Sequence, residues 1–382
     1  MTDDRRPDDG DRGRAGSPVA LFAHIGGGFF RDRRAVAWRL VLTLAVLAIG
    51  QIAVQLLLNL WGGAIFDAIE QRDVAVMLRQ ALLFAGLAVA FLALSAYHIY
   101  GKMRLQVAWR EWITDRLLAD WLVPGRDRVL SLKGHDLDNP DQRIAEDVRL
   151  ATEAAVDLAD GLFHAVLILG CFVGLLWTLS HTLTFTLWPG VVIELPGYLV
   201  WAAVAYASVG TLLTYLLGRP LVRLNQDRLS NEADFRFGLM GMRGGPSQPR
   251  GDDERQRDLL RRFARVIATW RQLMLRTRRL SFLTAGYAVI ATGFPVLIAS
   301  PQYFAQLISL GGLMQATAAF VTVQVTLSWF VDNYPRFADW SASVHRIDAL
   351  RRAIDGPVRG GRREAAASRG GGPTASDAVP NA

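Results

Sequence analysis

The sequence predicts an all-α, polytopic membrane protein with six transmembrane helices, several of which continue well beyond the bilayer. Hydrophobic residues make up 51% of the 382 residues, and charged residues make up only 20%. With a mean hydropathy of +0.21, the chain is too apolar for an ordinary soluble protein. Six apolar stretches are separated by connections in which arginine is very unevenly distributed. These observations predict several membrane spans with one fixed orientation.

The N-terminal segment, residues 1–34, is expected to be disordered or to lie at the membrane interface. Its first residues are rich in aspartate, arginine and glycine and contain no apolar core of a cleavable signal peptide. Residues 19–37 mix apolar and basic side chains, which favours a helix along the inner leaflet. The three glycines at 26–28 disfavour a helix at that point.

Six segments have the length and composition of a transmembrane helix, which needs about 20 apolar residues to cover roughly 30 Å. They are residues 40–61, 80–100, 161–180, 195–218, 281–299 and 309–331. The connections on one side of the membrane are short, because they comprise 62–79, 181–194 and a few residues around Pro301.

The distribution of basic residues predicts the orientation. Lysine and arginine number 7 in residues 1–37, 9 in 101–157, 15 in 219–280 and 8 in 335–382. The alternate connections hold 2, none and none. The positive-inside rule therefore predicts a multi-pass membrane protein with both termini in the cytoplasm. Because the arginines lie beside the spans, we expect the lipid bilayer and no nucleic acid as their partner.

The two large cytoplasmic segments are predicted to be helical hairpins that extend the spans. Residues 101–123 continue the second span, and a helix restarts near residue 140 and runs into the third. Residues 219–242 continue the fourth span, Gly244 to Asp253 break the helix, and 254–280 lead into the fifth. The Gly/Arg/Ala/Ser/Pro-rich residues 353–382 are expected to form a disordered tail, which leaves 35–352 as the folded domain.

The stretch from Asp138 to Arg149 carries a helix-start pattern. Asn139 is a good N-cap, and Pro140 falls at the first helical position, where its missing N–H costs nothing. Gln142 has the spacing to reach back to the cap as in a capping box. Acidic side chains follow in the first turns, where the helix dipole favours them, and alternate with arginine. The charged residues of this tip are Asp141, Arg143, Glu146 and Asp147.

Polar residues recur at helical spacing inside two spans. Gln51, Gln55 and Asn59 share one face of the first span, and Gln324 and Ser328 make a similar face near the inner end of the sixth. Such side chains line a water-filled translocation path, or they hydrogen-bond between helices and only hold the bundle together.

Two groups are candidates for proton coupling. Asp157, Asp160 and His164 share a face near the start of the third span, where an acid–imidazole group can relay protons. The alternative is a solvated helix face, and the spacing does not indicate a metal site. Glu194 stands at the outer end of the fourth span, where it either accepts a proton or is an interfacial residue before a helix start.

Several sequence motifs, taken in order, resemble the transmembrane domain of ABC exporters and, more narrowly, the SbmA/BacA-like permeases of cobalamin, bleomycin and antimicrobial peptides. These permeases are in turn similar to peroxisomal fatty-acyl half-transporters. The motifs are Asn59-Leu60-Trp61 through Phe66-Asp67-Ala68, Asn139 to Asp147, Glu194 to Trp201, Gly218 to Val222, Glu232 to Phe237, and Ser328 to Asp332.

The resemblance implies an ABC exporter-type fold, a homodimer around the translocation path, and cytoplasmic helix tips that dock on nucleotide-binding domains. No G-x-x-x-x-G-K-[ST] phosphate loop occurs in the 382 residues. We therefore expect no nucleotide-binding domain in this chain, no cofactor of its own, and ATP only through a separate ATPase subunit. The proton gradient is the other energy source that the resemblance allows.

The predicted function is a transporter subunit that moves peptide-like or other bulky amphipathic solutes, and not an enzyme. No catalytic constellation of the zinc-protease, redox-cysteine or nucleophilic-serine type occurs in the sequence. In the family, the second cytoplasmic tip usually has a Glu/Ala-rich helix, where this chain has Gly244 to Asp253. The alternative is therefore a truncated or degenerate relative that dimerises without active transport.

Overall fold

The computed structural model describes residues 17–122, 140–180, 183–188, 191–241 and 249–370. The chain divides into two compact units, and each is described by itself. The first comprises residues 1–54, 88–164 and 332–382, and the second comprises 55–87 and 165–331. Among the described residues, six helices are long and apolar enough to cross a membrane, which confirms the predicted number of spans.

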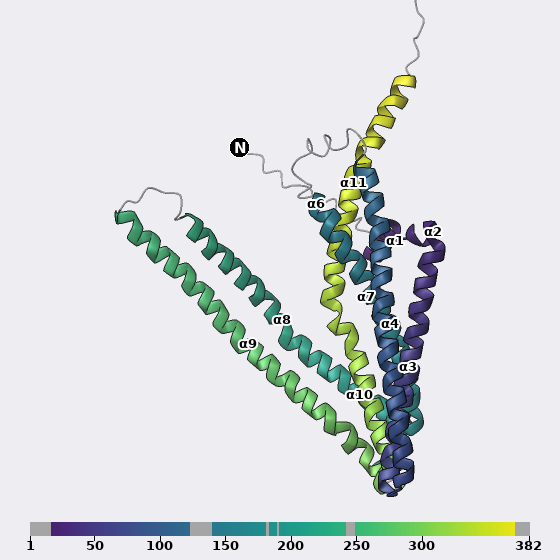
Figure 1. Ribbon diagram of the computed structural model, residues 1–382. Helices are drawn as coiled ribbons and strands as arrows, with labels where there is room; N and C mark the ends of the chain where they lie inside the picture. Colours follow the sequence, from purple (N-terminus) through teal and green to yellow (C-terminus); the bar gives the residue numbers. More distant parts are fainter. Residues whose placement is uncertain (1–16, 123–139, 181–182, 189–190, 242–248, 371–382) are drawn as a thin grey trace, which may run out of the picture. The chain divides into compact units, whose positions relative to one another are not determined.

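The helices are longer than the predicted spans, as expected for a protein whose helices continue into water (Figure 1). Most of the apolar runs continue into a polar extension within one helix; the fourth does so across Pro220, whereas the sixth ends at Asp332, before the next helix begins at Tyr334. The long helices are α3 (Arg34–Glu70), α4 (Val74–Trp121), α7 (Val148–Leu179), α8 (Tyr198–Gly241), α9 (Pro249–Phe304), α10 (Leu310–Asp332) and α11 (Tyr334–Gly370).

The predicted interfacial segment forms two short helices, α1 (Pro18–Gly26) and α2 (Phe29–Asp32). The break between them falls at Gly27 and Gly28, where the sequence disfavoured a helix. Phe29 is fully buried in the core of the first unit, and the indole N–H of Trp109 donates to the Gly26 carbonyl at 3.0 Å. The segment is therefore packed against α4; its place at a membrane surface stays a prediction.

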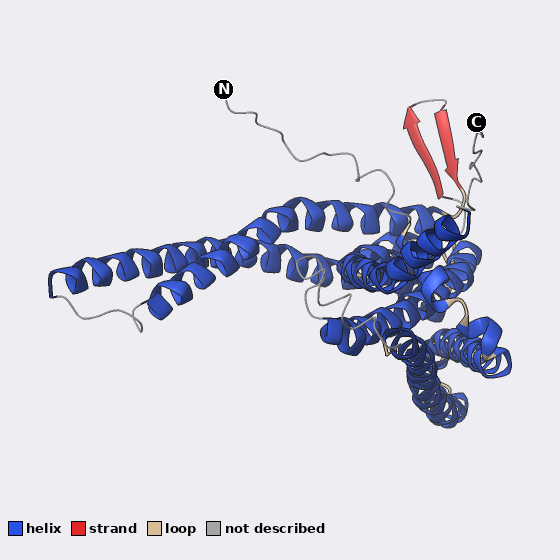
Figure 2. Cartoon of the chain, turned by 90° about the horizontal axis from the view of Figure 1, so that it is seen from above, coloured by secondary structure: helices blue, strands red, loops and turns tan. Residues whose placement is uncertain are grey.

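A short antiparallel hairpin adds the one departure from an all-helical fold among the described residues (Figure 2). It pairs β1 (Leu183–Trp188) with β2 (Val191–Leu195), with Leu183 opposite Leu195. The sequence predicted only a connection between the third and fourth spans here. The reason for the hairpin is local, because both segments are rich in β-branched and large apolar residues that favour strands.

Helices α8 and α9 lie side by side as a long antiparallel hairpin (Figures 1 and 2). The rings of Tyr206 and Tyr287 stack with centroids 4.4 Å apart. Each hydroxyl donates to the other residue's backbone carbonyl, at 2.6 and 3.0 Å. Toward the polar end of the hairpin, Asn231 donates to Thr269 at 2.9 Å and the Arg228 guanidinium lies over the Trp270 ring. Polar contacts thus join the two helices at two levels.

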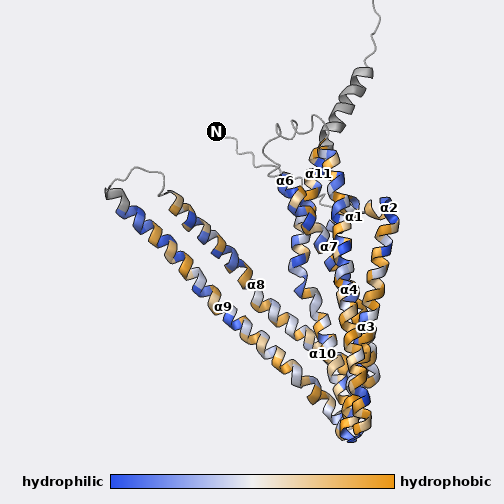
Figure 3. Ribbon diagram, viewed as in Figure 1, coloured by the Kyte–Doolittle hydropathy of each residue, from blue (hydrophilic) through white to orange (hydrophobic). Residues whose placement is uncertain are grey.

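The distribution of hydropathy along α8 and α9 follows the predicted change from membrane to water (Figure 3). Hydrophilic residues gather toward the ends that meet at 241–249, and apolar residues gather toward the other ends. The second unit also has a buried apolar core, to which Phe172, Leu176, Leu199 of α8 and Phe320 contribute.

Two helix boundaries differ from the prediction. Helix α9 begins at Pro249, so 249–253 are helical although they were expected to break the helix, whereas 244–248 lie outside the described residues. Pro249 is tolerated at the first helical position, and the acidic residues after it favour a helix N-terminus. Helix α11 continues to Gly370, across residues expected to be disordered; its Arg/Glu/Ala-rich stretch has high helix propensity.

Two glycines of α8 provide a test of the α8–α9 contact. A Cβ atom on Gly210 would overlap the Tyr287 ring, whereas one on Gly218 would meet no atom within 4 Å. We expect Gly218→Ala to leave the melting temperature of the detergent-solubilised protein unchanged or slightly raised, because alanine favours a helix by about 1 kcal/mol. Gly210→Ala should lower it, because overpacking costs about 1–3 kcal/mol. Equal effects of the two substitutions would contradict the contact.

Candidate functional site

The predicted docking tip forms a short helix, α6 (Pro140–Gln142), which is followed by a π-helical turn over Arg143–Asp147. The N-cap candidate Asn139 lies outside the described residues. The Gln142 amide N–H donates to Glu146 at 3.0 Å, a contact between residues four apart on one helix face. The predicted reach of Gln142 back to the cap involves Asn139 and stays a prediction.

An ion pair fastens this tip to α11. The carboxylate of Asp147 is buried and accepts from the Arg346 guanidinium, at 2.9 Å and 3.0 Å from Nε and 2.7 Å from Nη2. The same Nη2 also donates to Ser343 Oγ at 3.0 Å. Ile144 packs beside this pair against Leu350 and Ile354 of α11. One side of the tip is therefore held by α11.

The other side of the tip is open. Asp141, Gln142 and Glu146 are exposed, and Arg143 is half-buried. The sequence placed Asp147 in one group with these residues. In the structure Asp147 is buried and pairs with Arg346, whereas Asp141, Gln142 and Glu146 are exposed. The π-helical turn was not predicted; such turns add a residue to the helix and are frequent at functional sites.

A second polar cluster lies inside the first unit and centres on His98 of α4, which is 5% exposed. Its Nε2 atom lies 2.8 Å from Asp160 Oδ1 on α7, and its Nδ1 atom lies 2.6 Å from Gln51 Oε1 on α3. The Gln51 amide also donates to Ser95 Oγ at 2.9 Å. One side chain thus connects three helices. Sequence reasoning proposed Gln51 and Asp160 for separate roles and missed His98, a lone histidine in an apolar run.

The cluster continues one turn toward the basic ends of α4 and α7. Lys102 Nζ lies 3.1 Å from Asp157 Oδ1, and Gln106 donates to the same oxygen at 3.0 Å. The predicted third member, His164, is half-buried, and its ring centroid is 6.2 Å from that of His98. Asp157, Asp160 and His164 therefore share a face as predicted, and that face meets partners on α4.

The other path candidates also have partners within the bundle. Asn59 is buried and donates to the Gln315 carbonyl of α10 at 3.3 Å, and Gln55 is half-buried. Gln324 is buried and donates to the Tyr287 hydroxyl at 3.3 Å. The hydroxyl of Ser328 donates to the backbone carbonyl of Gln324 at 3.3 Å. In this arrangement Asn59 and Gln324 connect helices, which is the second interpretation that the sequence allowed, whereas the Ser328 bond lies within α10. Lining of a path by them stays a prediction.

The end of α3 caps the N-terminus of α10, a contact that the sequence did not predict. Asp67 accepts from the Gly311 N–H at 2.8 Å, and Glu70 accepts from the Leu310 N–H at 3.2 Å and from the Tyr303 hydroxyl at 3.0 Å. A carboxylate is stabilising at a helix N-terminus, where N–H groups lack intrahelical partners. These acids therefore hold α3, α9 and α10 together at one end.

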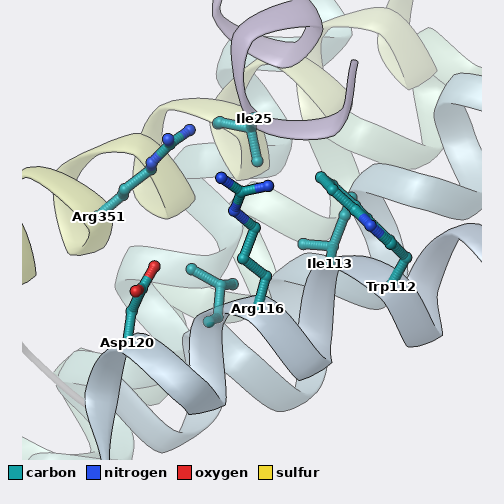
Figure 4. A pocket seen from close by; sticks show the side chains of 7 residues that line it. Ile25, Trp112, Ile113, Arg116, Asp120 and Arg351 are labelled. Carbon is teal, nitrogen blue, oxygen red and sulfur yellow. The ribbon is translucent and has the colours of Figure 1, made fainter. Parts of the chain in front are cut away.

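The remaining candidate, Glu194, lies in β2, where its backbone pairs with Thr184; its side chain lies outside the described residues. A small pocket is lined by α1, α4 and α11 (Figure 4). The Arg116 guanidinium lies over the Trp112 ring there, and Arg351 donates to the His24 carbonyl. Its volume of about 10 Å³ is that of a single water, so it is no solute-binding cavity.

Comparison with known proteins identifies the kind of bundle to which these sites belong. The model of the family ABC transporter transmembrane region 2 matches residues 29–304. The chain is 29% identical over 313 residues to the Inner membrane ABC transporter ATP-binding protein YddA of Escherichia coli, covering 81% of this chain and 56% of that protein. It is 25% identical over 333 residues to ABC transporter D family member 2, chloroplastic, of Arabidopsis thaliana, covering 86% and 44%. The chain spans about half the length of these relatives.

The anchor of the tip can be tested by two neighbouring substitutions. Asp147→Asn removes the charge of a buried carboxylate and weakens its bonds to the Arg346 guanidinium, whose side chain is 47% exposed, so we expect a destabilisation of about 1–2 kcal/mol. Glu146→Gln changes an exposed carboxylate bonded to Gln142 and should cost less than about 1 kcal/mol. Hydrogen exchange of residues 140–150 is the measurement; it should accelerate in Asp147→Asn alone. Equal acceleration in both variants would contradict the anchor.

Proposed function

Because the chain belongs to the ABC transporter transmembrane region 2 family, we propose that it is the permease subunit of a transporter in the bacterial inner membrane. It moves peptide-like or other bulky amphipathic solutes by alternating access, in which two halves open a central path to one side at a time. Both termini and the helix tip at 140–147 face the cytoplasm, in line with the concentration of basic residues in these segments.

The observation that carries this proposal is the construction of the tip. Its inner side is fixed to α11 by the buried Asp147–Arg346 pair, and its outer side presents Asp141, Gln142 and Glu146 to solvent. A surface that transmits a domain movement must be rigid toward its own bundle and free toward its partner. The proposed partner is a nucleotide-binding ATPase subunit, which fits the words "ATP-binding protein" in the names of relatives of which the match covers about half.

The proposed assembly is a homodimer. Large apolar side chains are exposed along α8 and α9, among them Leu212, Leu216, Val289 and Ile290. Lipid can cover such side chains, and so can a second copy of the chain. A path wide enough for a bulky solute needs more than six helices to surround it, which favours a second copy of the chain as the partner. Alternating access then becomes a movement of two equal halves.

The proton gradient is the second candidate energy source. It is the mode of the SbmA/BacA-like permeases that the sequence resembles. The His98–Asp160 pair supports it here, because buried ionisable groups within a membrane bundle mark proton and ion pathways. A relative that dimerises without transport is the alternative function.

The test is uptake of a labelled cationic peptide into inverted membrane vesicles from cells that produce the protein, with ATP or a pH gradient imposed separately. The proposal expects peptide accumulation that depends on one of the two drives. Loss of accumulation on ATP depletion indicates the ATPase partner, and loss with an uncoupler alone indicates the proton gradient. Equal peptide uptake in vesicles with and without the protein would indicate the non-transporting relative.

Charge reversal at the tip gives a sharper prediction. Arg143→Glu should abolish ATP-dependent accumulation, because it replaces the basic side chain between Asp141 and Glu146 by a third acid, while membrane insertion and dimerisation stay intact. Arg149→Glu is the matched control, since Arg149 lies two turns further along and pairs with Glu153 at 2.9 Å. It should retain most of the transport. Full transport by Arg143→Glu would count against docking at this tip.

A further inference from the structure

The ring of His98 has an oxygen acceptor at each nitrogen. Asp160 Oδ1 lies 2.8 Å from Nε2, and Gln51 Oε1 lies 2.6 Å from Nδ1. Neither oxygen can donate when Asp160 is ionised, so both ring nitrogens must carry a proton to make these bonds. The arrangement is that of an imidazolium ion paired with a carboxylate in a buried place.

The same side chains can also accommodate a neutral imidazole. If the Gln51 amide turns by half a revolution, its NH₂ group faces Nδ1 and its oxygen faces Ser95. The Ser95 hydroxyl can then donate to that oxygen, while Nε2–H still donates to Asp160. Every hydrogen bond of the set survives the loss of one proton from Nδ1. A buried histidine without such a second arrangement leaves a polar group unpaired when it changes its protonation state, which costs free energy.

The net charge of His98 and the groups around it is zero when the His98 ring is protonated. Asp160 faces the ring from α7, and His164 on the same helix lies with its centroid 6.2 Å away. One turn further, Lys102 of α4 and Asp157 of α7 form their own ion pair at 3.1 Å. With His98 protonated and His164 neutral, the charges of Asp157, Asp160, His98 and Lys102 sum to zero. Loss of the proton leaves one net negative charge, which is costly where it is not exposed to water.

We propose that Gln51, Ser95, His98 and Asp160 form a reversible proton-binding site whose occupancy is tied to the packing of α3, α4 and α7. A proton taken from water binds at Nδ1, forms the ion pair and holds the three helices together. Its release turns the Gln51 amide and leaves Asp160 uncompensated, which favours separation of α7 from α4. In this assignment His98 is the proton acceptor, in place of His164. A role of this proton-binding site in transport rests on the function proposed above, whereas the existence of the site does not.

The experiment is ¹⁵N NMR of the full chain, labelled in histidine and reconstituted in lipid nanodiscs. The chain has 6 histidines, and the His98→Gln variant assigns the His98 resonances by their loss. We expect two protonated ring nitrogens on His98 at the lower end of the range of about pH 5 to 8, in which histidine changes charge. One of them should lose its proton as the pH rises.

Two substitutions of aspartate by asparagine show whether the ion pair is responsible. Asp160→Asn removes the charge next to the ring with little change in shape, and the doubly protonated form should disappear at pH values where the unaltered protein shows it. Asp258→Asn is the control, because Asp258 pairs with Arg262 on the exposed face of α9. It should leave the His98 resonances unchanged.

Two results would overturn the proposal: His98 carrying a single proton throughout this pH range, or an unchanged titration in Asp160→Asn. Failure of the proposed function gives a different result, because vesicles without peptide accumulation would leave the His98 titration in place. Conversely, if the protein transports peptide while His98 never changes its protonation state, the proposed proton-binding site is wrong and the proposed transport function stands.

Discussion

A polar side chain within a membrane bundle must find its partner inside the protein, because hydrocarbon offers none, and this constraint sets the contacts between the helices. His98 is its clearest case, since the ring joins α3, α4 and α7 through Gln51 and Asp160. Asn59 in turn bonds a carbonyl of α10. Each such contact also fixes the relative height of the helices that it joins.

The tip and the buried cluster belong to one compact unit and share one helical segment. Asp147 and Asp160 stand 13 residues apart along the π-turn and α7, or about 20 Å at the rise of a helix. Asp147 ties the start of this segment to α11, and Asp160 ties its next turns to α4. A displacement of the tip therefore acts on the His98 contact, and a change at His98 acts on the tip. The proposed ATPase contact and the proposed proton site therefore lie on the same helical segment.

The sequence predicted what depends on local composition. Apolar length predicted the six helices, and the glycines at 26–28 marked the break between α1 and α2, whereas the orientation expected from the arginine counts stays a prediction. Which side chains hydrogen-bond to one another depends on tertiary contacts and was not predicted from the sequence. The predicted spans put Gln51 in the middle of the first and His98 at the end of the second, yet their contact places both at one level. The caps that Asp67 and Glu70 form were not predicted, because the helix that they cap comes some 240 residues later in the chain.

The His98–Asp160 contact holds α4 to α7. A double-mutant cycle measures the free energy that this contact contributes. The free energy of unfolding in mixed micelles would be measured for the unaltered protein, His98→Gln, Asp160→Asn and the double variant. If the contact exists, the two substitutions should be non-additive by at least about 1 kcal/mol, since the second removes a partner already lost. Additive effects within about 0.3 kcal/mol would show two independent side chains and contradict the account.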